Sequence, residues 1–157
     1  MNIDQVRNYS KESILDLISN QENPVSLTFI SISSNKPISI PIWTYFHEDK
    51  FYCFASGSSK KVQSIKTGNN IISLLIINKN FYPHPESGII PFLGISGKAK
   101  ICTSSDNPET ALIHQKLLLK YDPDLSQGWI RDLYNKIKAN PKDDWLIEIY
   151  PERYYSG

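Results

Sequence analysis

The feature that most constrains the fold is a set of short segments in which apolar and polar residues alternate. In 25–33, Val25, Leu27 and Phe29 are separated by small polar residues. A period of two residues is typical of a β-strand that buries one face. Six strands are predicted from this alternation or from short apolar runs, at 25–33, 38–46, 51–55, 71–77, 93–101 and 143–151.

Two of these strands carry further information. The segment 71–77 (IISLLII) is apolar throughout, which predicts a strand covered on both faces. In 93–101, the small residues Gly97 and Ala99 fall on the inward face, which indicates that another part of the chain packs closely there. The stretch between these two strands has a proline on each side of His84 and is predicted to be an irregular loop.

Four helices are predicted between the strands, at 10–19, 56–68, 105–121 and 126–140. The clearest is 126–140, because Ile130, Leu133, Tyr134 and Ile137 recur at helical spacing. No β-α-β unit repeats, so a parallel sheet is not expected. The expected fold is mainly β with peripheral helices, a six-stranded antiparallel barrel in a single domain of residues 1–157, because closure removes exposed strand edges.

The charge balance and the apolar runs exclude several classes of partner. The 157 residues include 17 Lys and Arg against 16 Asp and Glu, a formal net charge of +1. The chain therefore lacks the excess of positive charge that is typical of proteins that bind nucleic acid or an anionic membrane, and neither is an expected partner. No apolar run is long enough to span a bilayer, and the first residues lack the apolar core of a signal peptide. A cytoplasmic location is therefore expected.

The sulfur and imidazole groups do not form a recognisable site. Cys53 and Cys102 both lie in apolar strand patterns and are predicted to be reduced thiols in or near the core. His47, His84 and His114 fall in a turn, a loop and a helix. No group of residues has the spacing of metal ligands, so no metal is expected.

The helix at 56–68 (SGSSKKVQSIKTG) carries two lysines in its first turn. A helix N-terminus bears partial positive charge, so Lys60 and Lys61 are disfavoured there by about 0.3–1 kcal/mol each at an exposed site. A bound anion would reverse this, because charge-assisted hydrogen bonds contribute about 1.5–3 kcal/mol each. The local sequence leaves two interpretations open: solvated lysines tolerated at a small cost, or a phosphate-binding seat.

The order of the elements around this helix resembles the flavin-binding split-barrel family related to pyridoxamine 5′-phosphate oxidase. The resemblance runs from VSLTFISI through PIWTYFHEDKFYCFASGSSKKVQSIKTGNNIISLLI and ISGKAKI to WLIEIYPERYY, which is most of the chain. The individual motifs are short, so its specificity comes from their order and spacing. It implies a six-stranded antiparallel split β-barrel and a homodimer that binds flavin mononucleotide (FMN) at its interface.

The resemblance also implies which residues bind the cofactor. A Ser-Arg-Lys motif that holds the FMN phosphate in the family is matched by Ser59, Lys60 and Lys61, with lysine in place of arginine. The strand end before it is matched by Phe54, Ala55 and Ser56, whose backbone would lie beside the isoalloxazine ring. The preceding strand, 39–44, would supply further backbone contacts. The implied cofactor-binding residues in that strand end are Ile42, Trp43 and Thr44.

Departures from the family pattern leave the substrate unassigned. Ser39 and Thr44 stand where the vitamin oxidases carry Arg and Lys, Phe92 stands where a glutamine is expected, and PERYYSG does not match the segment that grips the vitamin phosphate. Related split barrels use a deazaflavin or bind haem. The function implied is therefore an FMN-dependent oxidoreductase acting on a small molecule by hydride transfer. The alternatives are a deazaflavin-dependent reductase and a cofactor-binding protein without turnover. No catalytic side chain is identified.

Overall fold

The computed structural model of the protein describes residues 10–77, 92–141 and 145–156. These residues form seven strands and four helices, which confirms the mainly β fold with peripheral helices. In chain order the elements are α1 (Lys11–Ser19), β1 (Val25–Ile30), β2 (Pro37–Ile42), β3 (Thr44–His47), β4 (Lys50–Phe54), α2 (Lys60–Lys66), β5 (Ile71–Ile77), β6 (Phe92–Thr103), α3 (Glu109–Tyr121), α4 (Gly128–Ala139) and β7 (Trp145–Ser156). The predicted loop around His84 lies outside the described residues.

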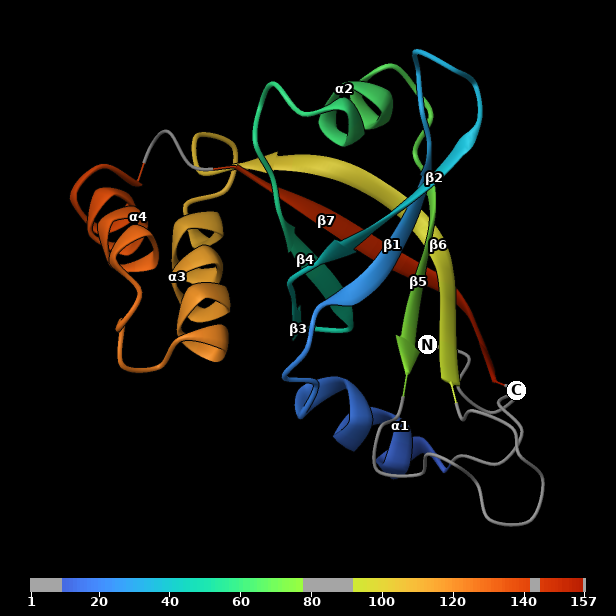
Figure 1. The fold of residues 1–157 in the computed structure, drawn as a ribbon, viewed down its shortest axis with the longest axis horizontal. Helices are drawn as coiled ribbons and strands as arrows, with labels where there is room; N and C mark the ends of the chain where they lie inside the picture. Colours follow the sequence, from blue (N-terminus) through green and yellow to red (C-terminus); the bar gives the residue numbers. More distant parts are fainter. Residues whose placement is uncertain (1–9, 78–91, 142–144, 157) are drawn as a thin grey trace.

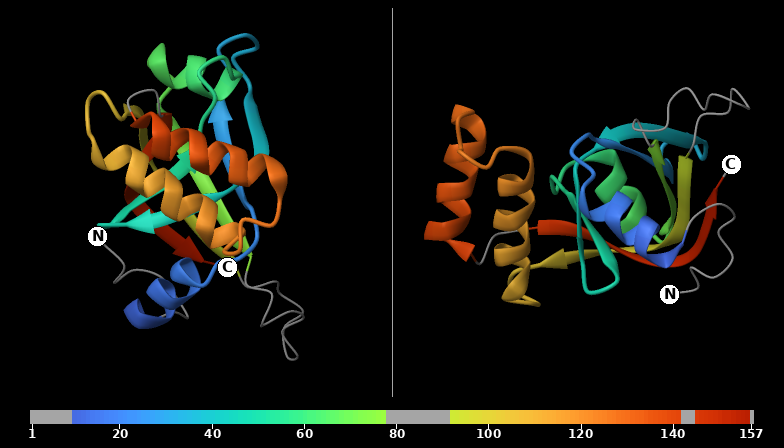
Figure 2. Two further views of the ribbon diagram at one scale, coloured as in Figure 1. Left: turned by 90° about the vertical axis from the view of Figure 1, so that its left-hand side faces the viewer. Right: turned by 90° about the horizontal axis from the view of Figure 1, so that it is seen from below.

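All seven strands belong to one antiparallel sheet in the order β2-β1-β5-β6-β7-β4-β3. The two edge strands, β2 and β3, are consecutive in the chain and are joined by Trp43 alone. The sheet must therefore curl until its edges approach each other, and Figure 2 shows the curled sheet from below. This arrangement confirms the predicted antiparallel split barrel.

The strand count differs from the predicted six because the segment 38–46 changes partner. Its first part, β2, pairs with β1, and its second part, β3, pairs with β4. A strand that closes a barrel must leave one neighbour for the other, and the break falls at Trp43. The apolar alternation runs on through this break, which is why the sequence predicts one strand here.

Two short helices close the ends of the barrel. Figure 1 shows α2 at one end and α1 at the other, and the view along the barrel in Figure 2 places both over its interior. Helix α1 buries Ile14 and Ile18, and α2 buries Val62 and Ile65, all in the same core cluster as the inward side chains of the strands. The interior is therefore a packed core.

The other two helices form a hairpin on the outside of the barrel. Figure 1 shows α3 beside β3 and β4, with α4 packed on the far side of α3. Ile130 and Ile137 of α4 are buried against Leu118 of α3, which confirms the helical spacing predicted from the sequence. This hairpin brings the C-terminal end of α3 to the edge strand β3.

The predictions for β5 and β6 have different outcomes. An added Cβ at Gly97 would collide with the carbonyl oxygen of Tyr150, which confirms that another strand packs closely at this position. The prediction that β5 is covered on both faces is wrong for the described chain. Ile72, Leu74 and Ile76 are buried, whereas the outward-pointing Ile71 and Ile77 are 68% and 48% exposed. The outward side chains between them, Ser73 and Leu75, are partly exposed.

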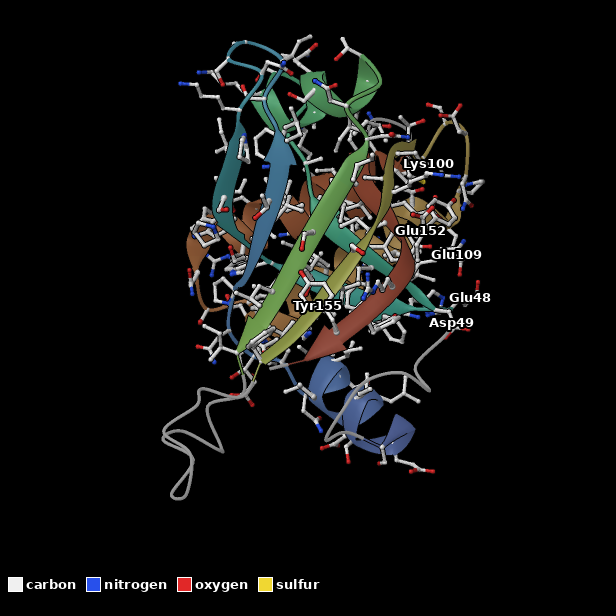
Figure 3. All side chains as sticks on the ribbon, turned by 90° about the vertical axis from the view of Figure 1, so that its right-hand side faces the viewer. Glu48, Asp49, Lys100, Glu109, Glu152 and Tyr155 are labelled. Carbon is white, nitrogen blue, oxygen red and sulfur yellow. The ribbon has the colours of Figure 1, made fainter. Side chains whose placement is uncertain are left out.

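A buried carboxylate lies on the outer face of β7. Glu148 is 3% exposed and forms ion pairs with Lys50, at 3.0 Å, and with Lys100, at 2.9 Å. Its carboxylate also accepts hydrogen bonds from Tyr52, at 3.1 Å, and Tyr150, at 2.6 Å. Burial opposes ionisation of Glu148, but hydrogen bonds from Tyr150, Lys100 and Lys50 outweigh it and hold its pKa at about 2. Figure 3 shows Lys100 on this side of the barrel.

We expect Glu148→Gln to lower the free energy of unfolding at pH 7 by about 1–3 kcal/mol, because charge-assisted hydrogen bonds are lost inside the fold. The folded pKa lies below the unfolded value, so this contribution is present above about pH 4.5 and is lost as the pH falls toward 2. Urea unfolding at pH 7 and pH 3 measures the difference in unfolding free energy between the parent and the variant. This difference should be smaller at pH 3. Glu152→Gln, which removes an exposed pair with Lys98, is the control and should cost less than about 1 kcal/mol. A difference independent of pH would contradict this account.

Candidate functional site

The residues predicted to hold a phosphate lie at the start of α2, directly after β4. Ser59 is the N-cap of this helix, and its hydroxyl accepts a hydrogen bond from the Val62 amide at 3.4 Å. The hydroxyl predicted to face a phosphate therefore already has a partner within the helix. Lys60 is exposed to solvent, whereas Lys61 is partly buried. Among these three residues, Lys61 differs most from an ordinary surface side chain.

Lys61 is a partly buried cation without an acidic partner in the described part of the chain. Burial is the main cause that lowers the pKa of Lys61. Cys53 is fully buried, and burial raises its own pKa to about 12, so it stays neutral. Removing a cation from water without pairing it is unfavourable, and an anionic ligand at Lys61 would offset that cost.

The two segments predicted to lie beside a flavin ring come together at one end of the β3–β4 pair. Thr44, the first residue of β3, is opposite Cys53, near the end of β4. The segments 42–44 and 54–56 therefore extend from adjacent positions in the sheet. Ile42 and Ala55 are buried, while Phe54 is partly exposed and its ring meets His114 of α3 edge-on at 5.5 Å. The sequence placed these segments near each other correctly, while their contact with a cofactor stays a prediction.

Sequence reasoning missed the contribution of α3. The Tyr121 hydroxyl accepts a hydrogen bond from the Thr44 amide at 3.0 Å and lies 3.2 Å from the Thr44 carbonyl oxygen. Lys120 donates to the same carbonyl oxygen at 3.2 Å. Both side chains occupy the edge of β3 that faces away from β4. No local pattern could have shown this, because the partners lie more than seventy positions apart in the sequence.

Three aromatic rings stack at the join between β2 and β3. The Trp43 ring lies between Tyr121, with centroids 4.7 Å apart and planes at 6°, and Trp129, at 5.5 Å and 22°. Trp129 remains 54% exposed despite this stacking. The stack fixes the end of α3 and the start of α4 against the single residue that joins β2 to β3.

Lys120 is the second partly buried lysine at this site. Burial lowers its pKa to about 8, although its position in the last turn of α3 favours a cation through the helix dipole. Desolvation therefore affects the pKa of Lys120 more strongly than the helix dipole does. Lys61 follows β4 in the chain, and Lys120 contacts the first residue of β3. Among the described residues, neither lysine has an acidic partner.

A surface hollow lies elsewhere on the barrel. It measures about 410 Å³ and is bounded by β1, β2 and β5, with Ser26, Ser39, Pro41 and Leu75 among its lining residues and neither lysine. We give it less weight than Lys61 and Lys120 as a cofactor site, because its lining offers hydroxyls, amides and apolar groups but no charged side chain.

Comparison with solved structures supports the fold. The chain is similar to a conserved hypothetical protein from Mycobacterium tuberculosis, with 15% identity over 94% of this chain and 84% of that one and a TM-score of 0.68. It is also similar to an F420 reductase, with 15% identity, 87% and 92% coverage and a TM-score of 0.61. A putative pyridoxamine 5′-phosphate oxidase from Listeria innocua has 18% identity, 92% and 95% coverage and a TM-score of 0.58.

At these identities the likeness establishes the fold, and the chain has the split-barrel fold of the pyridoxamine 5′-phosphate oxidase-like proteins. No protein-family model and no curated protein matches the sequence. Within the described residues, no three of the His, Cys, Asp and Glu side chains are grouped as metal ligands would be. In the same part of the chain, every helix is too short or too polar to cross a membrane.

We expect Lys120→Met to raise the free energy of unfolding at pH 7 by about 1–2 kcal/mol in the absence of ligand, because it removes a desolvated charge that is only partly screened by solvent. Between pH 8 and 10.5 the unfolded parent binds the lysine proton more tightly than the folded parent, so the parent gains stability as the pH rises. The advantage of the variant should therefore shrink over this window. Urea unfolding at pH 7 and pH 10 checks it, and a variant less stable than the parent at pH 7 would show that the bond to Thr44 matters more than the charge.

Proposed function

We propose that the protein binds FMN and acts as a flavin-dependent oxidoreductase on a small-molecule substrate. One observation carries this proposal: Lys61, at the start of α2, is partly buried and has no acidic partner among the described residues. The family resemblance implies that the FMN phosphate binds at this position. The donor chemistry fits, because a lysine ammonium binds phosphate as a point charge and Lys60 lies beside it in the same turn. The fold shared with a putative pyridoxamine 5′-phosphate oxidase adds support.

In this proposal the residues of the chain have distinct tasks. Ser59, Lys60 and Lys61 hold the phosphate, and Ser59 also caps the helix that presents the two lysines. The backbone of 54–56 and of 42–44 positions the ring. Bound FMN would supply hydride transfer, while the protein supplies binding, orientation and charge. The substrate remains open within the class of small molecules.

A deazaflavin reductase is the second candidate, favoured by the fold shared with an F420 reductase, since F420 is a deazaflavin. Titration of the purified protein with FMN and with F420 separates the two, because the preferred cofactor should bind more tightly. A protein that binds either cofactor without reduction by nicotinamide dinucleotides would fit the third alternative, binding without turnover. We propose a cytoplasmic location, and the two free, buried thiols, Cys53 and Cys102, fit a reducing compartment.

We expect Lys61→Met to weaken FMN binding by about 10- to 100-fold, because it removes a charge-assisted contact to the phosphate. Riboflavin, which lacks the phosphate, should bind the parent and the variant equally. The dissociation constants are measured by quenching of flavin fluorescence. Lys136→Met, an exposed lysine of α4, is the matched control and should bind FMN like the parent. Equal loss of FMN and riboflavin affinity would place the phosphate away from Lys61.

We also propose a homodimer, formed through the outer face of β1, β5 and β6. Figure 3 looks onto this face, and the described helices lie beyond its ends or behind it. Strand register places Thr28, Ser73 and Ser96 in one outward row across the three strands. The Tyr155 ring lies over Gly94 on this face, and its hydroxyl is 3.0 Å from that of Ser73. The exposed Ile71 and Ile77 of β5 add apolar area. Such a surface fits a second copy of the same face.

We expect Ser73→Arg to convert the dimer to a monomer, because it places a long charged side chain at the centre of the outward row. Leu112→Arg, on the exposed face of α3 and 49% exposed in the parent, is the control and should remain a dimer. Sedimentation velocity measures the mass and circular dichroism confirms the fold. A monomeric parent, or a dimeric Ser73→Arg variant, contradicts this interface.

A further inference from the structure

A lysine that the sequence did not single out lies beside the backbone proposed to hold the flavin ring. The Nζ of Lys120 is 3.2 Å from the carbonyl oxygen of Thr44. Thr44 is opposite Cys53 in the sheet, and the segment 54–56 follows directly from there. The amine therefore lies beside the backbone of 42–44, one of the two segments proposed to contact the ring.

The amine has donors left over. An ammonium group carries three N–H donors, and among the described residues the carbonyl oxygen of Thr44 is the one acceptor for Lys120. Its other contact is with the Tyr121 ring, whose centroid is 5.4 Å away. No carboxylate of the described chain pairs with it. The cation is thus held at a defined place with spare bonding capacity and without neutralisation.

The position of Lys120 is fixed by its neighbours. Tyr121 bonds to both backbone groups of Thr44, and its ring is stacked on Trp43, which is in turn stacked on Trp129. These contacts anchor the last turn of α3 to the edge of β3. The ammonium is therefore preorganised relative to the strand, which is what an electrostatic role requires.

We infer that Lys120 is a cofactor-binding residue whose ammonium stabilises the negative charge that the flavin ring gains when it takes up two electrons and one proton. The inference rests on the proposed function, since it needs a ring beside Thr44. It assigns separate tasks to the two lysines. Lys61 binds the phosphate equally in both redox states, whereas Lys120 favours the reduced state and so raises the reduction potential of the bound cofactor.

The test is the midpoint potential of FMN bound to the full-length protein, measured by stepwise anaerobic reduction with dithionite and a reference dye. Lys120→Gln retains a donor for the Thr44 carbonyl but removes the charge. We expect reduced FMN to bind about tenfold more weakly relative to oxidised FMN in this variant, a shift of about 30 mV to lower potential for a two-electron couple. Lys120→Met is a second neutral variant and should shift the potential in the same direction.

Three further variants separate charge from structure. Lys120→Arg keeps the charge and should keep the potential of the parent. Lys116→Gln, an exposed lysine one turn earlier on α3, should have no effect. Lys61→Met should weaken both redox states alike and leave the potential unchanged.

The outcomes are distinguishable. If FMN binds and both neutral variants retain the potential of the parent, the inference is overturned and the proposed function stands. If Lys120→Arg shifts the potential as far as Lys120→Gln does, the effect comes from lost packing and the inference is equally overturned. If the parent binds neither FMN nor F420, the proposed function fails and the inference falls with it.

Discussion

The covalent join between the two edge strands is the constraint on which the rest of the structure depends. Strands β2 and β3 lie at opposite ends of the sheet order, yet one residue, Trp43, connects them. The sheet can satisfy this only by curling into a barrel whose open seam passes Trp43. Pro37 and Pro41 in β2 lack amide hydrogens and so cannot extend the hydrogen-bond ladder, which protects that edge from pairing with another strand.

The seam also explains why the α3–α4 hairpin packs where it does. An edge strand leaves backbone groups without ladder partners, and at Thr44 these are satisfied by Tyr121. The indole of Trp43 is covered on its two faces by Tyr121 and Trp129. The α3–α4 hairpin, which lies between β6 and β7 in the chain, thus covers the join between β2 and β3. It also brings Lys120 into contact with Thr44.

The sequence predicted those elements whose apolar residues recur with the period of a strand or a helix. Alternation at 25–33 predicted β1, and the helical spacing at 126–140 predicted α4. The division of 38–46 into two strands was not predictable, because a change of pairing partner leaves the alternation of side chains intact. The one-sided burial of β5 was missed because an apolar run does not say which face has a neighbour within the chain.

The candidate site divides in the same way. Ser59 and the two lysines after it were visible as a local motif, and the segments 42–44 and 54–56 were implied by the resemblance to the split-barrel family. Lys120 and Tyr121 had no local signal, since a lysine and a tyrosine at a helix end are ordinary. Their importance comes from a contact with Thr44 that exists only once the barrel has closed.

The distribution of charge over the barrel separates a structural ion cluster from a candidate binding site. Glu148 is buried, yet two lysines and two tyrosine hydroxyls compensate it, so that cluster is complete within the chain. Lys61 and Lys120 are partly desolvated too, but no described carboxylate compensates them. A chain with nearly equal numbers of acidic and basic residues could have paired these lysines as it paired Glu148. Two partly buried cations without acidic partners cost the protein stability, because burial penalises their charge. The proposed anionic ligand would offset that cost at Lys61.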